Sequence, residues 1–270
     1  MDRRSRHLPL LLTLALTAAA LLHGPIAQFA DYHAFADQLT LLGIPHFGDV
    51  LSNLGFAVVA LWGGWRLAPR RLTHFPLSWP GYALFLAGLL LTALGSGWYH
   101  LAPDDHRLLW DRLPIGLATA GLLAGVWADC RQRDSRLFAA LLGLAALAGV
   151  LWWYVGALHG GGDLRPYLLL QLLAIVLIPL WQWLYRRPRG ERLAFAGALG
   201  LYVLAKFAEL LDHQLAALLG PLTGHTLKHL LSTAAAAVIV AQLARRGPAA
   251  APLASDPDAV APSRHSIRHS

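Results

Sequence analysis

The residues best able to do chemistry lie at the edges of long apolar segments. Ser96 and His100 are four residues apart at the end of one such segment, and Asp111 follows eleven residues after His100, at the expected start of the next. Ionisable groups in or beside a bilayer are costly to desolvate, so they occur there mainly where partners or a function offset that cost. The stretch from 95 to 114 therefore indicates a functional site.

A second pair of histidines, His225 and His229, has the spacing i, i+4. On a helix this spacing puts both imidazoles on one face, about one turn apart, close enough to hold one metal ion. The pattern alone also occurs on ordinary polar helix faces. Together with His100, however, the pair would form a three-nitrogen set with an open fourth position, which is typical of a catalytic zinc site.

A carboxylate beside such a site can orient the attacking water and accept its proton, and Asp111 is placed to do so. The simpler interpretation of Asp111 is an ion pair with Arg107 or Arg112. Ser96 would face the same point as the ring of His100, because the two are one helical turn apart. The simpler interpretation of Ser96 is a hydrogen bond to a backbone carbonyl in a closely packed, glycine-flanked helix.

The composition is that of a polytopic membrane protein. The 270 residues have a mean hydropathy of +0.49, with 56% hydrophobic and 14% charged residues. The single cysteine, Cys130, excludes an intrachain disulfide and a cysteine-based zinc site, whereas thirteen histidines allow a histidine-based one. The net charge of +7 reflects arginines in short loops, and no basic domain outside the apolar segments indicates a nucleic-acid partner.

The apolar segments predict an all-α fold. Apolar runs of about 20 residues, enough to cross a bilayer, fall at 48–67, 80–101, 111–128, 137–157, 166–185, 192–212 and 223–243. We expect a polytopic membrane helix bundle whose parts are an N-terminal helix (1–23), an outer loop (24–47), a seven-helix core (48–245) and a disordered tail (246–270). The N-terminal helix also fits a cleaved signal peptide, although we expect it to be retained.

The arginines predict how the bundle is oriented. Most of them fall in loops on one side of the predicted topology, whereas the opposite loops contain only Arg107 and Arg165. By the positive-inside rule both termini are then cytoplasmic. Ser96, His100, Asp111 and the His225 pair would all lie near the outer, non-cytoplasmic face.

These motifs resemble the alkaline ceramidase family, which belongs to a superfamily that also includes the progestin and adipoQ receptors. The shared features are Ser-x3-His, the aspartate eleven residues on, and His-x3-His, and the resemblance covers roughly 45–245. It implies one catalytic zinc held by three histidines: His100, His225 and His229. It also implies that Asp111 activates water, that Ser96 polarises or stabilises the amide oxyanion, and that Ser52 and Asn53 have a supporting role.

The chain also departs from that family. Eukaryotic members carry an acidic calcium-binding segment before the first core helix, and the spacing of Asp31, Asp37 and Asp49 does not match it. This difference argues against bound calcium and against a simple transfer of ceramide as substrate. Further along, Lys206 and Glu209 fit a buried ion pair, and Asp212 is a candidate to support a metal-binding histidine.

We therefore expect a membrane zinc amidohydrolase that cleaves the N-acyl amide of ceramide-like lipids to a fatty acid and a long-chain base. Its partner would be the membrane lipid itself. One alternative is a zinc-containing lipid receptor or sensor without turnover. The other is a metal or proton transporter, which would need buried polar residues in both halves of the membrane.

Overall fold

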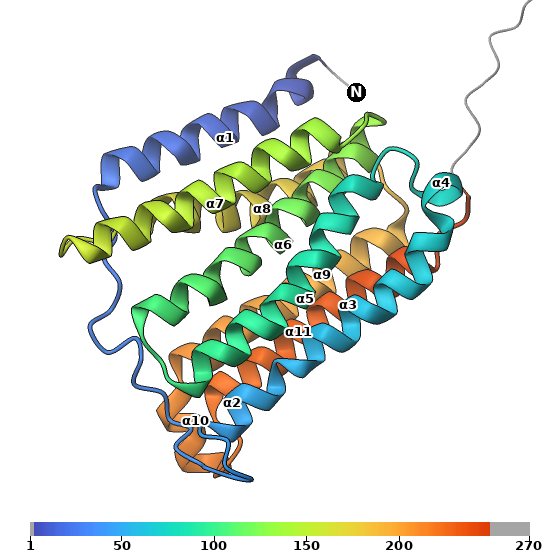
Figure 1. Ribbon diagram of the computed structural model, residues 1–270. Coiled ribbons are helices and arrows are strands. Elements are labelled where there is room, and N and C mark those ends of the chain that lie inside the picture. Colours follow the sequence, from blue (N-terminus) through green and yellow to red (C-terminus); the bar gives the residue numbers. More distant parts are fainter. Residues whose placement is uncertain (1–2, 249–270) are drawn as a thin grey trace, which may run out of the picture.

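The computed structural model describes residues 3–248, and this part of the chain forms a bundle of long helices without a β-strand (Figure 1). The predicted all-α fold is confirmed. The predicted disordered tail lies outside the described residues from 249 onward. The helices are α1 (Arg3–His23), α2 (Phe47–Ser52), α3 (Leu54–Leu67), α4 (Arg71–His74), α5 (Trp79–Leu101), α6 (Asp105–Arg131), α7 (Arg136–Leu158), α8 (Arg165–Leu184), α9 (Arg189–Leu210), α10 (Asp212–Leu219) and α11 (Gly224–Ala244).

The helices are long and apolar enough for a multi-pass membrane protein. Seven described segments meet that condition: Phe47–His74, Trp79–Leu101, Asp105–Arg131, Arg136–Leu158, Arg165–Leu184, Arg189–Leu210 and Gly224–Ala244. The first of them combines α2, α3 and α4, and the apolar part of α1, His7–His23, is shorter. Large side chains such as Leu141 and Leu144 point outward, as expected of a surface that faces lipid.

Small residues hold α5 and α6 against each other. Gly81, Gly88 and Gly95 are spaced by seven residues along α5 and therefore share one face. A methyl group at Gly95 would lie only 2.0 Å from the carbonyl oxygen of Trp110, and the other two glycines are similarly close to the α6 backbone. Close backbone approach at small residues is a common basis of helix association in membranes. At Gly95 it fixes the distance between Ser96 and the start of α6.

Helix α6 begins earlier than the apolar pattern predicts, at Asp105 rather than 111. The side chain of Asp104 accepts a hydrogen bond from the backbone N–H of Arg107, so it caps the helix, and the carboxylate of Asp105 in the first turn suits the helix dipole. Asp111 consequently lies inside the helix, about 1.7 turns from its start. The predicted loop 102–110 shrinks to a short connection.

Helix α1 packs on α8 and is tied to the loop after α7 by Asp163. This buried carboxylate accepts hydrogen bonds from the backbone N–H of Ile26 (3.1 Å) and from the guanidinium of Arg165 (2.9–3.1 Å). Burial by itself would raise the pKa of Asp163, but the hydrogen bonds from Arg165 and Ile26 bring it down to about 2. The carboxylate is therefore ionised at neutral pH and fastens α1 to the bundle.

A second buried network lies at the opposite end of the bundle, where the sequence pointed to no buried polar group. Arg246, just beyond α11, pairs with Asp129 of α6 and with Glu191 of α9. Tyr82 of α5 donates a hydrogen bond to the same Asp129, and Arg187 makes two hydrogen bonds to Glu191. The network joins the ends of α5, α6, α9 and α11, which gives it a structural role.

Candidate metal centre

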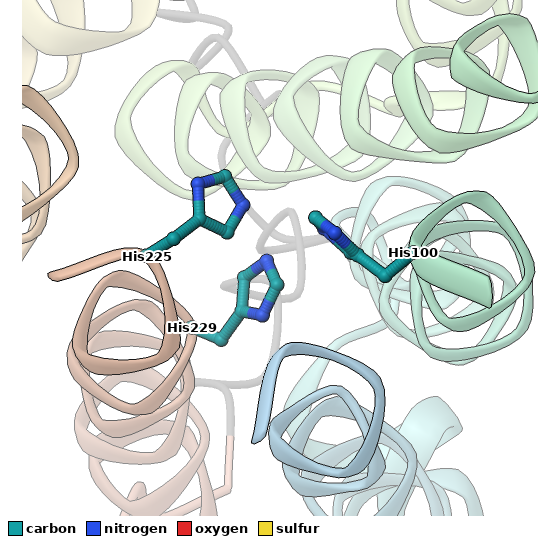
Figure 2. A group of neighbouring side chains, drawn as sticks. All are labelled: His100, His225 and His229. Carbon is teal, nitrogen blue, oxygen red and sulfur yellow. The ribbon is translucent and has the colours of Figure 1, made fainter. Parts of the chain in front are cut away.

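Three buried imidazoles converge at one end of the bundle. Figure 2 shows their rings pointing toward one another, His100 from α5 and His225 and His229 from α11. Each side chain is at most 3% exposed, the ring centroids are 4.8–5.0 Å apart, and one nitrogen from each ring lies within 4.8 Å of the others. The sequence pattern therefore selected residues that the fold brings together. A group of this kind could bind a metal ion.

The start of α11 is held so that its histidines face α5. Thr223 caps the helix by accepting the backbone N–H of Thr226 (3.1 Å). Gly224 packs so closely on α9 that a methyl group there would lie 2.2 Å from the carbonyl oxygen of Ala208. Asp212 accepts the backbone N–H of His225 at 2.7 Å, and its other oxygen accepts an N–H from the loop before α2. Asp212, which the sequence indicated as a candidate to support a metal-binding histidine, thus contacts His225 at its backbone N–H.

Ser52 orients the ring of His229. Its Oγ lies 2.9 Å from Nδ1 of His229 and 3.1 Å from the backbone oxygen of Asp49. If the hydroxyl proton goes to the Asp49 carbonyl, the serine oxygen accepts the Nδ1–H of His229, which leaves Nε2 with its lone pair. Asn53 donates to the same carbonyl at 2.7 Å. A hydrogen bond to the other ring nitrogen is the usual device for holding a metal-binding histidine.

The donor set fits a divalent transition metal. Nδ1 of His100 is buried and has no hydrogen-bond partner among residues 3–248, so a ring nitrogen is left for a cation. In a tetrahedral zinc site with Zn–N bonds of ~2.1 Å, two ligand nitrogens are about 3.4 Å apart. The ring nitrogens lie within 4.8 Å of one another, so binding requires the rings to move closer together by up to about 1.4 Å. Phe35, from the loop before α2, covers the group, with centroids 4.8 Å from His100 and 4.3 Å from His225.

Asp111 and Ser96 line one cavity together with His229. The alternative interpretation of Asp111 as an ion-pair partner fails for both arginines. Arg107 pairs with Asp104 at 2.6 Å, and the guanidinium of Arg112 stacks on aromatic rings, 4.1 Å from the centroid of Trp153. The carboxylate of Asp111 is therefore available to a molecule in the cavity.

The cavity continues from this polar end into the apolar interior. It has a volume of about 270 Å³ and lies between α3, α5, α6, α8, α9 and α11. Along α5 its lining runs from Ser96 back to Phe85, which is about 16 Å at 1.5 Å per residue. That depth is about half of the ~30 Å hydrocarbon core of a bilayer, or one leaflet. The cavity thus has a polar mouth and a depth suited to a hydrocarbon chain.

The structure also brings side chains to the site that the sequence did not indicate. Phe35 and Tyr32 come from the loop between α1 and α2, where a single aromatic residue has no distinguishing pattern. Lys228 lies between the two histidines of α11, and its Nζ is 2.8 Å from Nε2 of His225. The predicted ion pair of Lys206 and Glu209 is present at 2.5 Å, but it is not buried as predicted, because the Lys206 side chain is 51% exposed.

The chain was also compared with known proteins. No protein-family model, curated protein or solved structure matches it.

Proposed function

We propose that the protein is a membrane zinc amidohydrolase of the alkaline ceramidase type, which cleaves the N-acyl amide of a membrane lipid. The observation that carries the proposal is the convergence of three buried imidazoles beside a cavity that is also lined by Asp111 and Ser96. Three histidines leave a coordination position open for water or substrate, as in catalytic rather than structural zinc sites.

In this proposal the three histidines, His100, His225 and His229, hold one zinc ion. The ion would supply a water that ionises near neutral pH and would polarise the amide carbonyl. Asp111 accepts the proton of the attacking water and returns one to the leaving amine. The C–N bond breaks, water contributes the new C–O bond, and the products are a carboxylic acid and an amine. Ser96 donates a hydrogen bond to the developing oxyanion.

The cavity accounts for the choice of a lipid. An acyl chain would lie in the apolar part, with its first carbons at Ser96 and its end near Phe85. Burial of apolar surface contributes about 0.8 kcal/mol per methylene group, so a long chain gains far more than a short one. The amide would then be positioned at the polar mouth, beside Asp111. A ceramide-like lipid meets these requirements.

The first test is the metal content. Wild-type protein in lipid nanodiscs should contain about one zinc per chain by elemental analysis, because three histidines and water complete a tetrahedral site. His225→Ala should lose it, and His74→Ala, at the opposite end of the bundle, should keep it. A full equivalent of zinc in His225→Ala would exclude the proposed centre.

The second test separates an enzyme from a lipid receptor. A panel of N-acyl lipids, ceramides included, is incubated with the purified protein, with and without a zinc chelator, and the products are identified by mass spectrometry. We expect wild type to release fatty acid and free amine in the absence of the chelator, and to release neither in its presence. Asp111→Asn should keep zinc and lose turnover, whereas Asp134→Asn, remote from the cavity, should behave as wild type. If every lipid stays intact although the protein binds zinc, the alternative of a lipid receptor without turnover is favoured.

A further inference from the structure

The only two lysines of the chain, Lys206 and Lys228, meet at the mouth of the cavity. Both contact one carboxylate, Glu209: Nζ of Lys206 is 2.5 Å from Oε2, and Nζ of Lys228 is 3.0 Å from Oε1. We call these three residues the Lys-Glu-Lys cluster. All other basic side chains of the chain, apart from histidines, are arginines. A lysine presents a compact charge with three donors, so the cluster differs chemically from the arginine-rich ends of the bundle.

The cluster has a surplus of positive charge. Two ammonium groups share one carboxylate, which leaves a net charge of +1 within membrane-spanning helices. An unbalanced charge within membrane-spanning helices is costly and is usually offset by a partner of opposite charge. Lys206 makes one hydrogen bond to Glu209 and keeps further donors free, and its side chain is 51% exposed. The cluster can therefore accept another anionic group.

The neighbouring charges do not cancel this surplus. Asp111 also faces the cavity, but the guanidinium of Arg112 lies behind the cavity-lining rings of Tyr32 and Tyr167, 5.0 Å and 5.7 Å from their centroids. Nη1 of Arg112 is buried and has no hydrogen-bond partner among residues 3–248. The charged groups that line the mouth are two lysines and two carboxylates, and with Arg112 behind the wall the count is three cations to two carboxylates.

The cluster adjoins the proposed metal centre. Nζ of Lys228 is 2.8 Å from Nε2 of His225. His229 lines the cavity together with Lys228 and Asp111, so an anion held by the lysines would lie near a carbonyl group placed beside His229 and Asp111. A lipid carboxylate meets this condition in two ways: as the acid group of an N-acyl amino acid, or as the carboxylate of a fatty acid after cleavage.

We propose that the Lys-Glu-Lys cluster is a binding site for a lipid carboxylate, which directs the enzyme toward N-acyl amino acids and their fatty acid products. This inference rests on the proposed function for its choice of lipid. Lys206 and Lys228 donate hydrogen bonds to the carboxylate, and Glu209 keeps both ammonium groups in place. Charge-assisted hydrogen bonds of this kind contribute more than those to a neutral group.

The test measures binding, so it does not depend on turnover. Wild-type protein in nanodiscs of neutral lipid is titrated with two matched pairs of probes, in chelator and again with zinc. N-palmitoylglycine and N-palmitoylethanolamine differ in the headgroup carboxylate, and palmitate and hexadecanol differ in the terminal carboxylate. Dissociation constants come from native mass spectrometry. A protein that binds these lipids as expected but cleaves none would contradict the proposed function and not this site.

The variants change the charge of the cluster in both directions. Lys206→Met should weaken binding of the carboxylate probes about tenfold or more, because a charged hydrogen bond contributes ~1.5–3 kcal/mol, and should leave their neutral partners unchanged. Lys206→Arg should restore most of the affinity. Glu209→Gln raises the charge to +2 and should tighten carboxylate binding. Arg107→Met, at the same end but paired with Asp104, is the control and should have no effect.

The outcomes identify the source of the carboxylate or overturn the proposal. A loss limited to N-palmitoylglycine assigns the cluster to the headgroup, and a loss limited to palmitate assigns it to the product. Equal losses for charged and neutral probes would mean that Lys206 acts through packing, and unchanged affinity for all four probes would mean that the cluster binds no carboxylate. Either of these last two results contradicts the proposal.

Discussion

Gly95 offers a test of whether the close contact of α5 and α6 positions the site. The Cβ of an alanine at 95 would lie 2.0 Å from the carbonyl oxygen of Trp110, whereas ordinary contacts begin at 3.4 Å. Gly97, two residues later, has nothing within 4 Å of the same added atom. Gly95→Ala and Gly97→Ala therefore add the same methyl group to α5, the first with a clash and the second without one.

The expected magnitude follows from this geometry. Gly95→Ala must separate the helices by up to 1.4 Å (3.4 − 2.0) at this point, because the neighbouring atom is backbone. Overpacking of this size costs about 1–3 kcal/mol, which corresponds to a fall of about 2–12 °C in melting temperature for a chain of this length. A displacement of ~1 Å at a reacting group costs about 100-fold in rate. Gly97→Ala should be neutral or stabilise by up to about 1 kcal/mol.

Thermal unfolding in nanodiscs and zinc content are the primary measurements, with the rate of amide cleavage added once a substrate is known. We expect Gly95→Ala, but not Gly97→Ala, to lower the melting temperature. In Gly95→Ala, zinc is retained or reduced, and Asp111 is displaced from Ser96. Equal stability and equal activity of Gly95→Ala and Gly97→Ala would refute the argument that the close contact at Gly95 sets the distance between α5 and α6.

Three further predictions concern the metal, the ends of the helices and the orientation. Ser52→Ala should weaken zinc binding about 10- to 100-fold, measured by competition with a chelator, because His229 loses the partner of its Nδ1; unchanged affinity would contradict this role. The pKa of Asp163, depressed to about 2 from 3.8, stabilises the fold above about pH 4, and this contribution is lost as the pH falls toward 2. The difference in melting temperature between wild type and Asp163→Asn should therefore shrink on acidification, and a constant difference would exclude the linkage. In intact cells, an impermeant maleimide should label Gly161→Cys but not Gly190→Cys; the reverse pattern would invert the topology.

The membrane fold and the three candidate metal ligands, His100, His225 and His229, could be predicted from local patterns. Long apolar runs have few alternatives to helices in lipid, since every backbone hydrogen bond must be made within the segment. The i, i+4 spacing of His225 and His229 puts them on one face of any helix. The capping of α6 by Asp104 was a recognisable signal that the apolar pattern masked, so the start of this helix was predicted too late.

Other features depend on contacts between residues far apart in the chain. The sequence indicates that His100 and the pair in α11 are chemically suited to one metal, but the packing at Gly95 and Gly224 brings them together. Asp212 was a candidate to support a metal-binding histidine, and only the tertiary structure shows that it contacts the backbone N–H of His225. No local spacing relates Lys228 to Glu209, nineteen residues earlier, or Arg246 to Asp129.

The sequence by itself determined the apolar helices, the residue types of the triad and the spacing of its second half, because these follow from backbone hydrogen bonding and helical geometry. Only the tertiary structure decided how Ser52 orients His229, how Asp111 remains free of Arg107 and Arg112, and how both lysines converge on Glu209 at the mouth of the cavity. The physical reason is that these contacts join different helices. Their distances are set by close packing at small residues, which no single segment encodes.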